Sequence, residues 1–277
     1  MDRYVVIGNP VAHSKSPRIH AAFAAETGQQ LSYETLLAPC DGFAAAWEAF
    51  RAAGGRGANV TVPFKEDAWA LCDLRSPEAE LAGAVNTLSL TGDGRLRGDN
   101  TDGVGLVRDI TVNAGWSLRN CRVLLLGAGG AARGVLGPLL AAGASQVWVA
   151  NRSVDRAQTL AALFADAGDV RCGDLDTLSR PAPDGAFDLV INATSASLQG
   201  EALAIGPGWC HAGTAVYDMM YGCDTPFLAW ARGHGLTRRR DGLGMLVEQA
   251  AEAFRIWRGV RPGTAEVLAA LRGELNG

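Results

Sequence analysis

Lys65 is the residue whose position in the sequence first suggests chemistry. It lies in the first turn of a helix that we expect to begin at Pro63, where the positive end of the helix dipole disfavours a cation. By itself, that placement would lower the pKa of the amine and make Lys65 a better proton acceptor near neutral pH. The alternative is a surface lysine paired with Glu66 or Asp67, and the residues alone leave both readings open.

Asp102 belongs to a polar run between two glycines, residues 98–103, just before an apolar helical pattern. A helix N-cap would explain one of the polar residues 99–102, but a cap does not require four of them. If Asp102 faced Lys65 across a cleft, its carboxylate would orient the ammonium and raise its pKa, opposing the helix dipole. The net effect on the amine stays open at this stage.

A glycine-rich turn follows the apolar run Val123–Leu126 and leads into a helical pattern from Arg133 onward. Gly127, Gly129 and Ala132 fit the G-x-G-x-x-G/A pattern of a dinucleotide-binding turn. The first glycine permits the tight turn, the second lets backbone approach a pyrophosphate, and the helix N-terminus attracts the phosphates. Such turns also join strands to helices for structural reasons alone, and the strand–turn–helix context favours the nucleotide.

The charges after the next expected strand, Gln146–Ala150, predict which nicotinamide cofactor binds. The dinucleotide fold places an acid about here to hold the ribose of NAD, and arginine where a 2′-phosphate must be held. No acid occurs at positions 150–153, whereas Arg152 and Arg156 lie within reach of one phosphate. The sequence therefore predicts NADP(H) rather than NAD.

A set of neutral polar residues falls at expected strand ends, in loops and on one helix. Such a set suits a polyhydroxylated substrate better than a phosphorylated one, although each member alone could be a cap or turn residue. The set is Ser14, Ser16, Asn59, Thr61, Asn86 and Gln249.

The expected elements predict an α/β fold with two α/β domains and a cleft between them. Strands and helices alternate over residues 5–71, a hairpin at the sheet edge follows over 84–97, and a second set of strand–helix units begins at 123. Two amphipathic helices at the C-terminus, 243–257 and 263–275, are expected to pack back on the N-terminal unit. We therefore predict a substrate-binding domain from residues 1–102 plus 242–277 and a Rossmann-type NADP-binding domain from 103–241.

The composition of the chain limits the kinds of molecule that it is expected to bind. The chain has 277 residues and a net charge of −4, which argues against nucleic acid or a membrane surface as the main partner. The arginines in Thr237–Asp241 are therefore interpreted as a solvated linker. The six cysteines are scattered without metal-ligand spacing, so no metal site is predicted. No apolar run is long enough to span a membrane and no signal peptide is recognised, so a cytoplasmic location is expected.

Segments over nearly the whole chain resemble the shikimate dehydrogenase family of aromatic amino-acid biosynthesis. They stand in the family's order and at its spacing, which makes the resemblance specific. The segments are 8–17, 57–65, 84–87, 98–105, 127–131, 151–152, 192–195 and 241–245.

The resemblance implies reversible, NADPH-dependent reduction of 3-dehydroshikimate to shikimate on the path to chorismate. It implies that Lys65 is the proton donor and acceptor at the reacting oxygen, with Asp102 as its partner. The implied substrate contacts are Ser14, Ser16, Asn59, Thr61, Lys65, Asn86, Asp102, Tyr221 and Gln249. The implied cofactor contacts are Gly127, Ala128, Gly129, Gly130, Ala131, Asn151, Arg152, Ser153, Arg156, Thr194, Met219, Gly242 and Met245.

Two positions depart from the family pattern. Ala196–Leu198 stand where the family usually has small residues that include glycine, a change that bears on the loop over the nicotinamide. Ser153 stands where threonine is frequent. The predicted function is that of a shikimate dehydrogenase, as a monomer or a homodimer. The alternatives are a shikimate/quinate dehydrogenase with relaxed choice of substrate or cofactor, and a catalytically silent NADP-binding regulatory paralogue, which the presence of both Lys65 and Asp102 disfavours.

Overall fold

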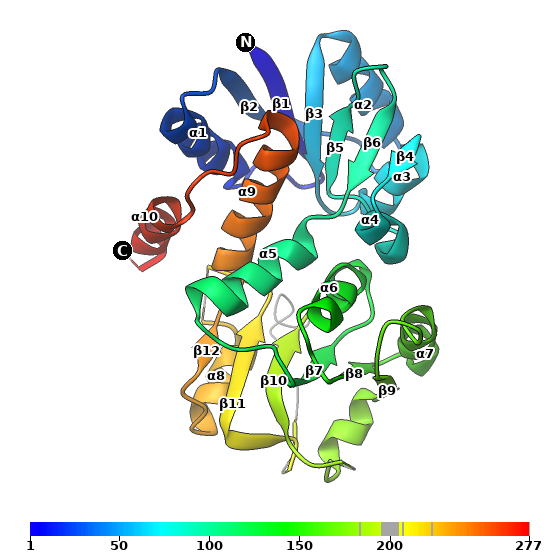
Figure 1. Cartoon of the computed structure of the whole chain (residues 1–277), viewed down its shortest axis with the longest axis vertical. Coiled ribbons are helices and arrows are strands. Elements are labelled where there is room, and N and C mark those ends of the chain that lie inside the picture. Colours follow the sequence, from blue (N-terminus) through cyan, green and yellow to red (C-terminus); the bar gives the residue numbers. More distant parts are fainter. Residues whose placement is uncertain (183, 195–204, 207, 223, 277) are drawn as a thin grey trace. The chain divides into compact units, whose positions relative to one another are not determined.

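The computed structural model describes residues 1–182, 184–194, 205–206, 208–222 and 224–276, which divide into two units (Figure 1). Unit 1 comprises Met1–Gly105 and Leu246–Glu274, and unit 2 comprises Leu106–Met245 and the last residues of the chain. The chain passes from one unit to the other within helix α5 (Asp102–Arg108) and again within helix α9 (Leu243–Arg258). Within the described ranges, no helix is both long and apolar enough to cross a membrane.

Unit 1 is built on a mixed sheet with the strand order β2-β1-β3-β5-β6-β4 among the described residues. The first three strands are parallel, as predicted, and β5 and β6 form the predicted hairpin. The hairpin is not at the sheet edge, because β4 pairs with β6 outside it; the two residues of β4 are too short to give a strand pattern. The strands are β1 (Asp2–Gly8), β2 (Leu31–Leu37), β3 (Gly55–Val60), β4 (Leu74–Arg75), β5 (Thr87–Leu90) and β6 (Leu96–Asp99).

The helices of unit 1 bury aromatic stripes against this sheet. In α2, Phe43, Trp47 and Phe50 recur at helical spacing and are buried, and Phe64 stacks on Phe43 with ring centroids 5.3 Å apart. Helix α3 begins at Lys65 rather than at Pro63. The helices are α1 (Ser16–Thr27), α2 (Phe43–Ala52), α3 (Lys65–Leu71), α4 (Pro77–Ala82) and α10 (Ala265–Asn276).

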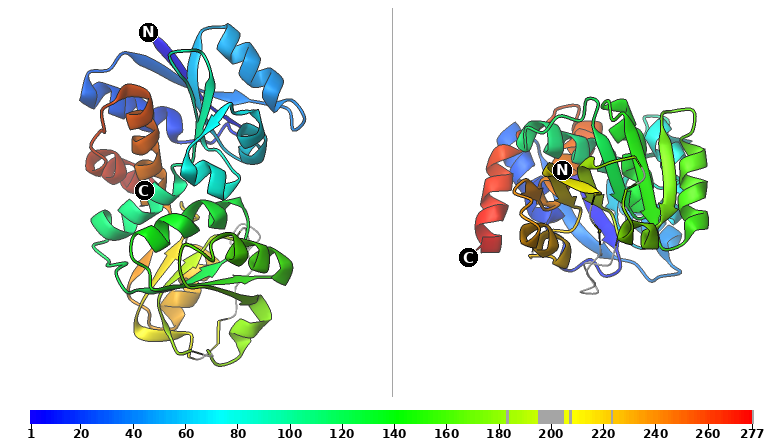
Figure 2. Two further views of the ribbon diagram at one scale, coloured as in Figure 1. Left: turned by 45° about the vertical axis from the view of Figure 1, so that its right-hand side comes forward. Right: turned by 90° about the horizontal axis from the view of Figure 1, so that it is seen from below.

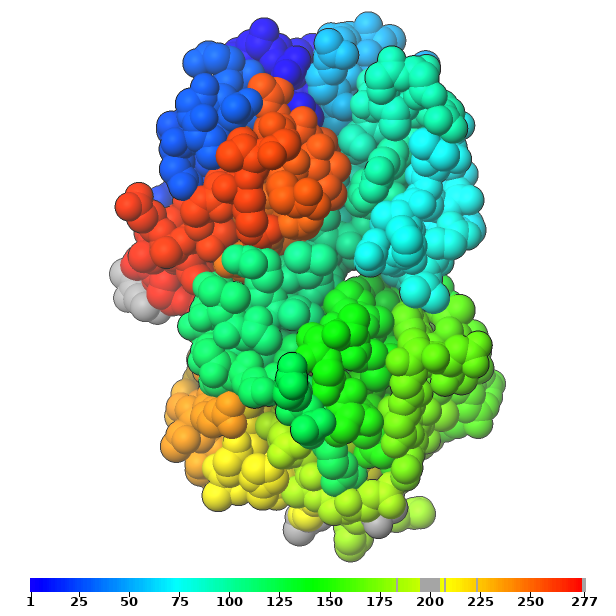
Figure 3. All heavy atoms as spheres, in the orientation of Figure 1, coloured from blue at the N-terminus to red at the C-terminus, as the bar shows by residue number. Residues whose placement is uncertain are grey.

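The C-terminal helices return to the N-terminal strands and helices, as predicted. The orange and red surface of α9 and α10 lies beside the blue surface of α1 in Figure 3. Arg258 pairs with Asp2 and donates to Gln29 Oε1 at 2.8 Å, and the backbone N–H of Gly263 donates to Glu26. These contacts close unit 1 although its two segments are far apart in sequence.

Unit 2 contains a parallel sheet with the order β12-β11-β10-β7-β8-β9 in the part of the chain that the structure describes. Counted from the first strand of the unit, this is the order of the dinucleotide-binding fold, 3-2-1-4-5-6. Helices cover both faces (Figure 2), so the strands are apolar on both sides. The strands are β7 (Arg122–Leu126), β8 (Gln146–Asn151), β9 (Val170–Asp174), β10 (Phe187–Asn192), β11 (Cys210–Asp218) and β12 (Arg239–Arg240).

The helices of unit 2 follow these strands in turn, and the fold class is as predicted: two α/β units, the second of Rossmann type. The helices are α6 (Gly130–Ala141), α7 (Val154–Leu163) and α8 (Pro226–Gly233), with a π-helix, η1 (Asp109–Asn113), and a 3₁₀ helix, η2 (Leu175–Ser179). One local expectation is wrong, because Arg239 and Arg240 form a strand rather than a solvated linker.

Candidate active site

Lys65 and Asp102 form a close ion pair in unit 1. The Nζ atom of Lys65 lies 2.5 Å from Oδ2 of Asp102, and their side chains are 24% and 10% exposed. Each residue begins a helix, Lys65 in α3 and Asp102 in α5. The carbonyl of Lys65 also accepts the N–H of Val85 at 2.9 Å, which fixes its backbone. Lys65 therefore pairs with Asp102 rather than with Glu66 or Asp67.

Asn86 holds the second oxygen of the Asp102 carboxylate. Its Nδ2 donates to Asp102 Oδ1 at 2.8 Å, and its own Oδ1 accepts the N–H of Thr101 at 2.9 Å. The N–H of Asp102 donates to Oδ1 of Asn100 at 3.1 Å. Asn100 and Thr101 thus help to support the Asp102 carboxylate, whereas the side chain of Asp99 pairs with Arg97.

A second layer of hydrogen bonds extends from Asn86 to strand β2. Asn59 Nδ2 donates to the Asn86 carbonyl and to Thr87 Oγ1, both at 3.2 Å. The Tyr33 hydroxyl donates to Asn59 Oδ1 at 2.7 Å. Sequence reasoning did not single out Tyr33, since a tyrosine inside an apolar strand carries no signal of a polar partner.

The remaining predicted substrate residues of unit 1 lie on the loops and on helix α9. Gln249 Oε1 lies 3.5 Å from Asn86 Nδ2 and 3.4 Å from Thr101 Oγ1. The N–H of Ser16 donates to Ser14 Oγ at 3.2 Å after β1, and Thr61 follows the end of β3. Tyr221 belongs to unit 2, whereas the rest of the predicted substrate set belongs to unit 1.

The predicted cofactor turn is present in unit 2 between β7 and α6. Gly127 has a φ of +107°, and a Cβ there would lie 3.1 Å from the carbonyl oxygen of Ala193. A Cβ on Gly129 or Gly130 would instead meet open space, so the backbone is accessible to a bulky anion. The first turn of α6 carries no acidic residue. This arrangement fits a pyrophosphate.

Arg152 and Arg156, the residues predicted to hold a 2′-phosphate, follow the end of strand β8. Strand β8 ends at Asn151, whose Nδ2 donates to the Ser153 carbonyl at 2.9 Å, and α7 begins at Val154. Both arginines are exposed, and neither forms an ion pair or a side-chain hydrogen bond among the residues that the structure describes. Two uncommitted guanidinium groups suit a phosphate and would leave a ribose hydroxyl without an acceptor.

The other predicted cofactor residues gather at the carboxyl ends of β10, β11 and β12. Thr194 Oγ1 donates to Asn192 Oδ1 at 2.7 Å, and the N–H of Met219 donates to the Asn192 carbonyl at 3.0 Å. The N–H of Gly242 donates to the Met220 carbonyl at 2.9 Å, and Met245 follows in α9. The predicted departure at Ala196–Leu198 lies outside the described residues.

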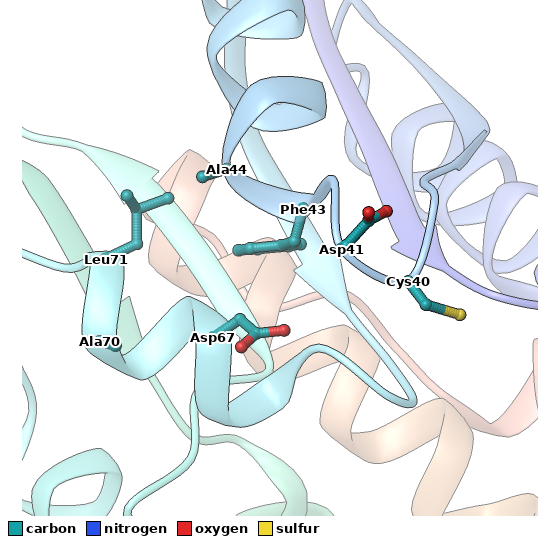
Figure 4. Close-up of a pocket in the computed structure, with 7 residues that line it drawn as sticks. All are labelled: Cys40, Asp41, Phe43, Ala44, Asp67, Ala70 and Leu71. Atoms are coloured by element: carbon teal, nitrogen blue, oxygen red, sulfur yellow. The ribbon is translucent and has the colours of Figure 1, made fainter.

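A pocket of about 360 Å³ lies elsewhere in unit 1, between α2 and α3 (Figure 4). Its lining combines apolar side chains with two carboxylates and a thiol, and it includes neither Lys65 nor Asp102. We do not assign it to the reaction. The lining residues are Cys40, Asp41, Phe43, Ala44, Asp67, Ala70 and Leu71.

Three family descriptions match the chain. Residues 6–88 match the shikimate dehydrogenase substrate binding domain, residues 109–199 match shikimate/quinate 5-dehydrogenase, and residues 242–272 match the shikimate 5′-dehydrogenase C-terminal domain. Together they cover more than half of the chain.

Relatives of known sequence and structure agree with these matches. The chain is 62% identical to shikimate dehydrogenase (NADP(+)) of Aromatoleum aromaticum, over 100% of this chain and 99% of the relative. The crystal structure of an Ael1 enzyme from Pseudomonas putida is similar with a TM-score of 0.89 and 47% identity, over 98% of both chains. Shikimate 5-dehydrogenase from Thermus thermophilus, in complex with NADP(H) and shikimate, gives a TM-score of 0.83 and 37% identity, over 98% of this chain and 99% of that one.

Proposed function

The chain belongs to the shikimate dehydrogenase family, and we propose that it catalyses the reversible, NADPH-dependent reduction of 3-dehydroshikimate to shikimate. The protein is an NADP-dependent oxidoreductase of the shikimate pathway. When bound, NADPH supplies a hydride to the ring ketone. The residues of the chain supply the proton, the orientation and the charge.

The Lys65–Asp102 pair is the observation that carries this proposal. Lys65 Nζ donates a proton to the ketone oxygen as it gains negative charge, and in the reverse direction the neutral amine accepts the hydroxyl proton. Asp102 orients the ammonium, and Asn86 fixes Asp102. The chain has only two lysines among its 25 basic Lys and Arg residues. An arginine could hold the same ion pair but could not release a proton, so the choice of lysine at this position fits proton transfer.

We further propose that the polar set of unit 1 binds the hydroxyl and carboxylate groups of shikimate. Neutral hydroxyl and amide groups donate and accept hydrogen bonds, which suits a polyhydroxylated ring. Two contacts support this role, because Asn86 donates to Asp102 of the catalytic pair and Gln249 lies next to Asn86. Tyr221, in unit 2, is the remaining substrate contact that the family resemblance implies.

In unit 2, the open backbone at Gly129 and Gly130 suits the pyrophosphate, and Arg152 with Arg156 suits the 2′-phosphate. Unit 1 is thus the proposed substrate domain and unit 2 the proposed NADP domain. We also propose a cytoplasmic location, which the free thiols of the described cysteines support. A monomer or a homodimer remains the expected assembly.

The decisive assay follows formation of the reduced cofactor, NADPH or NADH, by the purified chain with shikimate or quinate, each with NADP⁺ or NAD⁺. The proposed function predicts the highest kcat/KM with shikimate and NADP⁺. Comparable turnover of quinate or NAD⁺ would favour the relaxed dehydrogenase. Tight binding of NADP⁺ and shikimate without any turnover would instead indicate the silent paralogue.

A further inference from the structure

Asp109 is a completely buried carboxylate outside the proposed catalytic pair. It is the first residue of the π-helix η1 and is 0% exposed. Arg240, in strand β12, donates two hydrogen bonds to the Asp109 carboxylate, from Nε to Oδ2 at 2.9 Å and from Nη2 to Oδ1 at 2.8 Å. The Tyr217 hydroxyl donates to Oδ2 at 2.7 Å, and Asn113 Nδ2 donates to Oδ1 at 3.0 Å. A buried charge is tolerated only when it is paired and hydrogen-bonded in this way.

The residues that follow Arg240 pack closely against the Asp109 carboxylate. A Cβ on Gly244 would lie 1.8 Å from Oδ1 of Asp109, so no larger residue fits that position without displacing the carboxylate. A Cβ on Gly242 would lie 2.2 Å from the carbonyl oxygen of Met219. Residues 240–245 are therefore held on one side by Asp109 and on the other by the backbone after β11.

The same residues lie where the nicotinamide half of the cofactor would bind. In a sheet of this order, the first three strands bind the adenosine half of a dinucleotide and the last three bind the other half. Met219, Gly242 and Met245 follow the ends of β11 and β12, in the second group. The adenosine half would face Gly127 and Arg152, at the ends of β7 and β8.

We propose that Asp109 is a positioning residue, which acts through Arg240 and Gly244 to hold Gly242–Met245 in the shape that receives the nicotinamide half of NADP(H). This inference rests on the proposed function, because it requires NADP(H) in unit 2. Asp109 itself does not touch the cofactor in this scheme. Its substitution should therefore weaken binding of the nicotinamide half and spare the adenosine half.

The test compares NADP⁺ with adenosine 2′,5′-bisphosphate, which lacks the nicotinamide half, by calorimetric titration of the full chain. Arg240→Lys keeps the positive charge but cannot form both hydrogen bonds to the Asp109 carboxylate. We expect its Kd for NADP⁺ to rise about tenfold, because one charge-assisted hydrogen bond that shapes the nicotinamide end of the proposed site is lost. Its Kd for the bisphosphate should stay within about twofold, because the adenosine end of the site is unchanged. Arg171→Lys is the matched control, because Arg171 forms an exposed pair with Asp169 at the other side of the sheet.

A second variant separates positioning from stability. Asp109→Asn alone leaves the part-buried Arg240 without its anion and can unfold the chain, so Asp109→Asn/Arg240→Met removes both charges together. We expect this double variant to melt near the wild-type temperature and still to bind NADP⁺ weakly. Wild-type NADP⁺ affinity in either folded variant would overturn the inference, as would an equal loss for both ligands. A wild-type chain that binds neither ligand would overturn the proposed function itself.

Discussion

At the scale of single residues, the catalytic proposal depends on which cation sits beside Asp102. Lys65→Ala removes the proton donor and should lower kcat by roughly 10²- to 10⁴-fold while changing KM for shikimate little. Lys65→Arg is the sharper variant, because it keeps the ion pair yet cannot release a proton at neutral pH. We expect a similar loss of kcat for both, measured as steady-state NADP⁺ reduction.

The matched control for Lys65→Arg is Arg95→Lys, which exchanges the same two residue types in an exposed pair with Asp93. Arg95→Lys should leave both kcat and the KM for shikimate unchanged, because exposed ion pairs contribute little to stability. Near-normal kcat in Lys65→Arg would show that the residue supplies charge but not the proton.

His20 provides a separate prediction about acid stability. Its ring is fully buried and stacked on Tyr33 with centroids 4.2 Å apart, and neither ring nitrogen has a hydrogen-bond partner among the described residues. Burial lowers the pKa of His20 from 6.5 to about 3. Below pH 6.5 the unfolded chain therefore binds a proton that the folded chain does not, and stability falls as the pH falls.

We expect the His20→Phe variant to lose less stability than the wild type on going from pH 7 to pH 5. The ring contact with Tyr33 is retained, and the difference should be about 2 kcal/mol in the free energy of unfolding, since each pH unit below 6.5 costs about 1.4 kcal/mol. Urea denaturation at the two pH values measures it. Parallel losses in the two proteins would contradict the buried, neutral state of His20.

At the scale of elements, buried runs in the sequence predicted most strands correctly. Val123–Leu126 is apolar on both faces because helices cover both, and its residues are 0% exposed. The two-residue strands β4 and β12 could not be predicted, because two residues show no alternation and each strand is defined by its pairing with a neighbour. The contact of Arg240 with Asp109, 131 residues earlier, was equally hidden in the sequence. The closeness of Lys65 to Asp102 was likewise only a hypothesis, since no periodicity reports contacts over 37 residues.

The β8–α7 connection determines the predicted choice of cofactor. Arg152→Ala removes one guanidinium from the proposed 2′-phosphate site, and Asn151 offers no carboxylate for a ribose. We expect kcat/KM with NADPH to fall about 10- to 100-fold, the cost of one or two charge-assisted hydrogen bonds, with less than about a threefold change for NADH. Arg232→Ala, in an exposed pair on α8, is the control. An unchanged preference for NADPH over NADH would show that Arg152 does not bind the 2′-phosphate.

At the scale of the whole molecule, each unit has a hydrophobic core of its own. The core of unit 1 gathers around Phe43, Trp47 and Phe64, and that of unit 2 lies on the two faces of its parallel sheet. A substitution that disrupts the binding site of one unit without creating a cavity in its core should therefore leave the other unit folded. This separation makes the assignment of one ligand to each unit testable in the full chain.

Two substitutions test that assignment from opposite sides. Gly127→Val places a branched side chain at a φ of +107° and should raise the Kd for NADP⁺ at least about tenfold, because the turn must move and a strained residue costs about 1–3 kcal/mol. Asn86→Ala releases Asp102 and should weaken shikimate to a similar extent, since a hydrogen bond to a charged group is worth about 1.5–3 kcal/mol. Calorimetric titration of each variant with each ligand should show one affinity lost and the other kept within about threefold. If both variants lost both ligands, the division into a substrate domain and an NADP domain would be wrong.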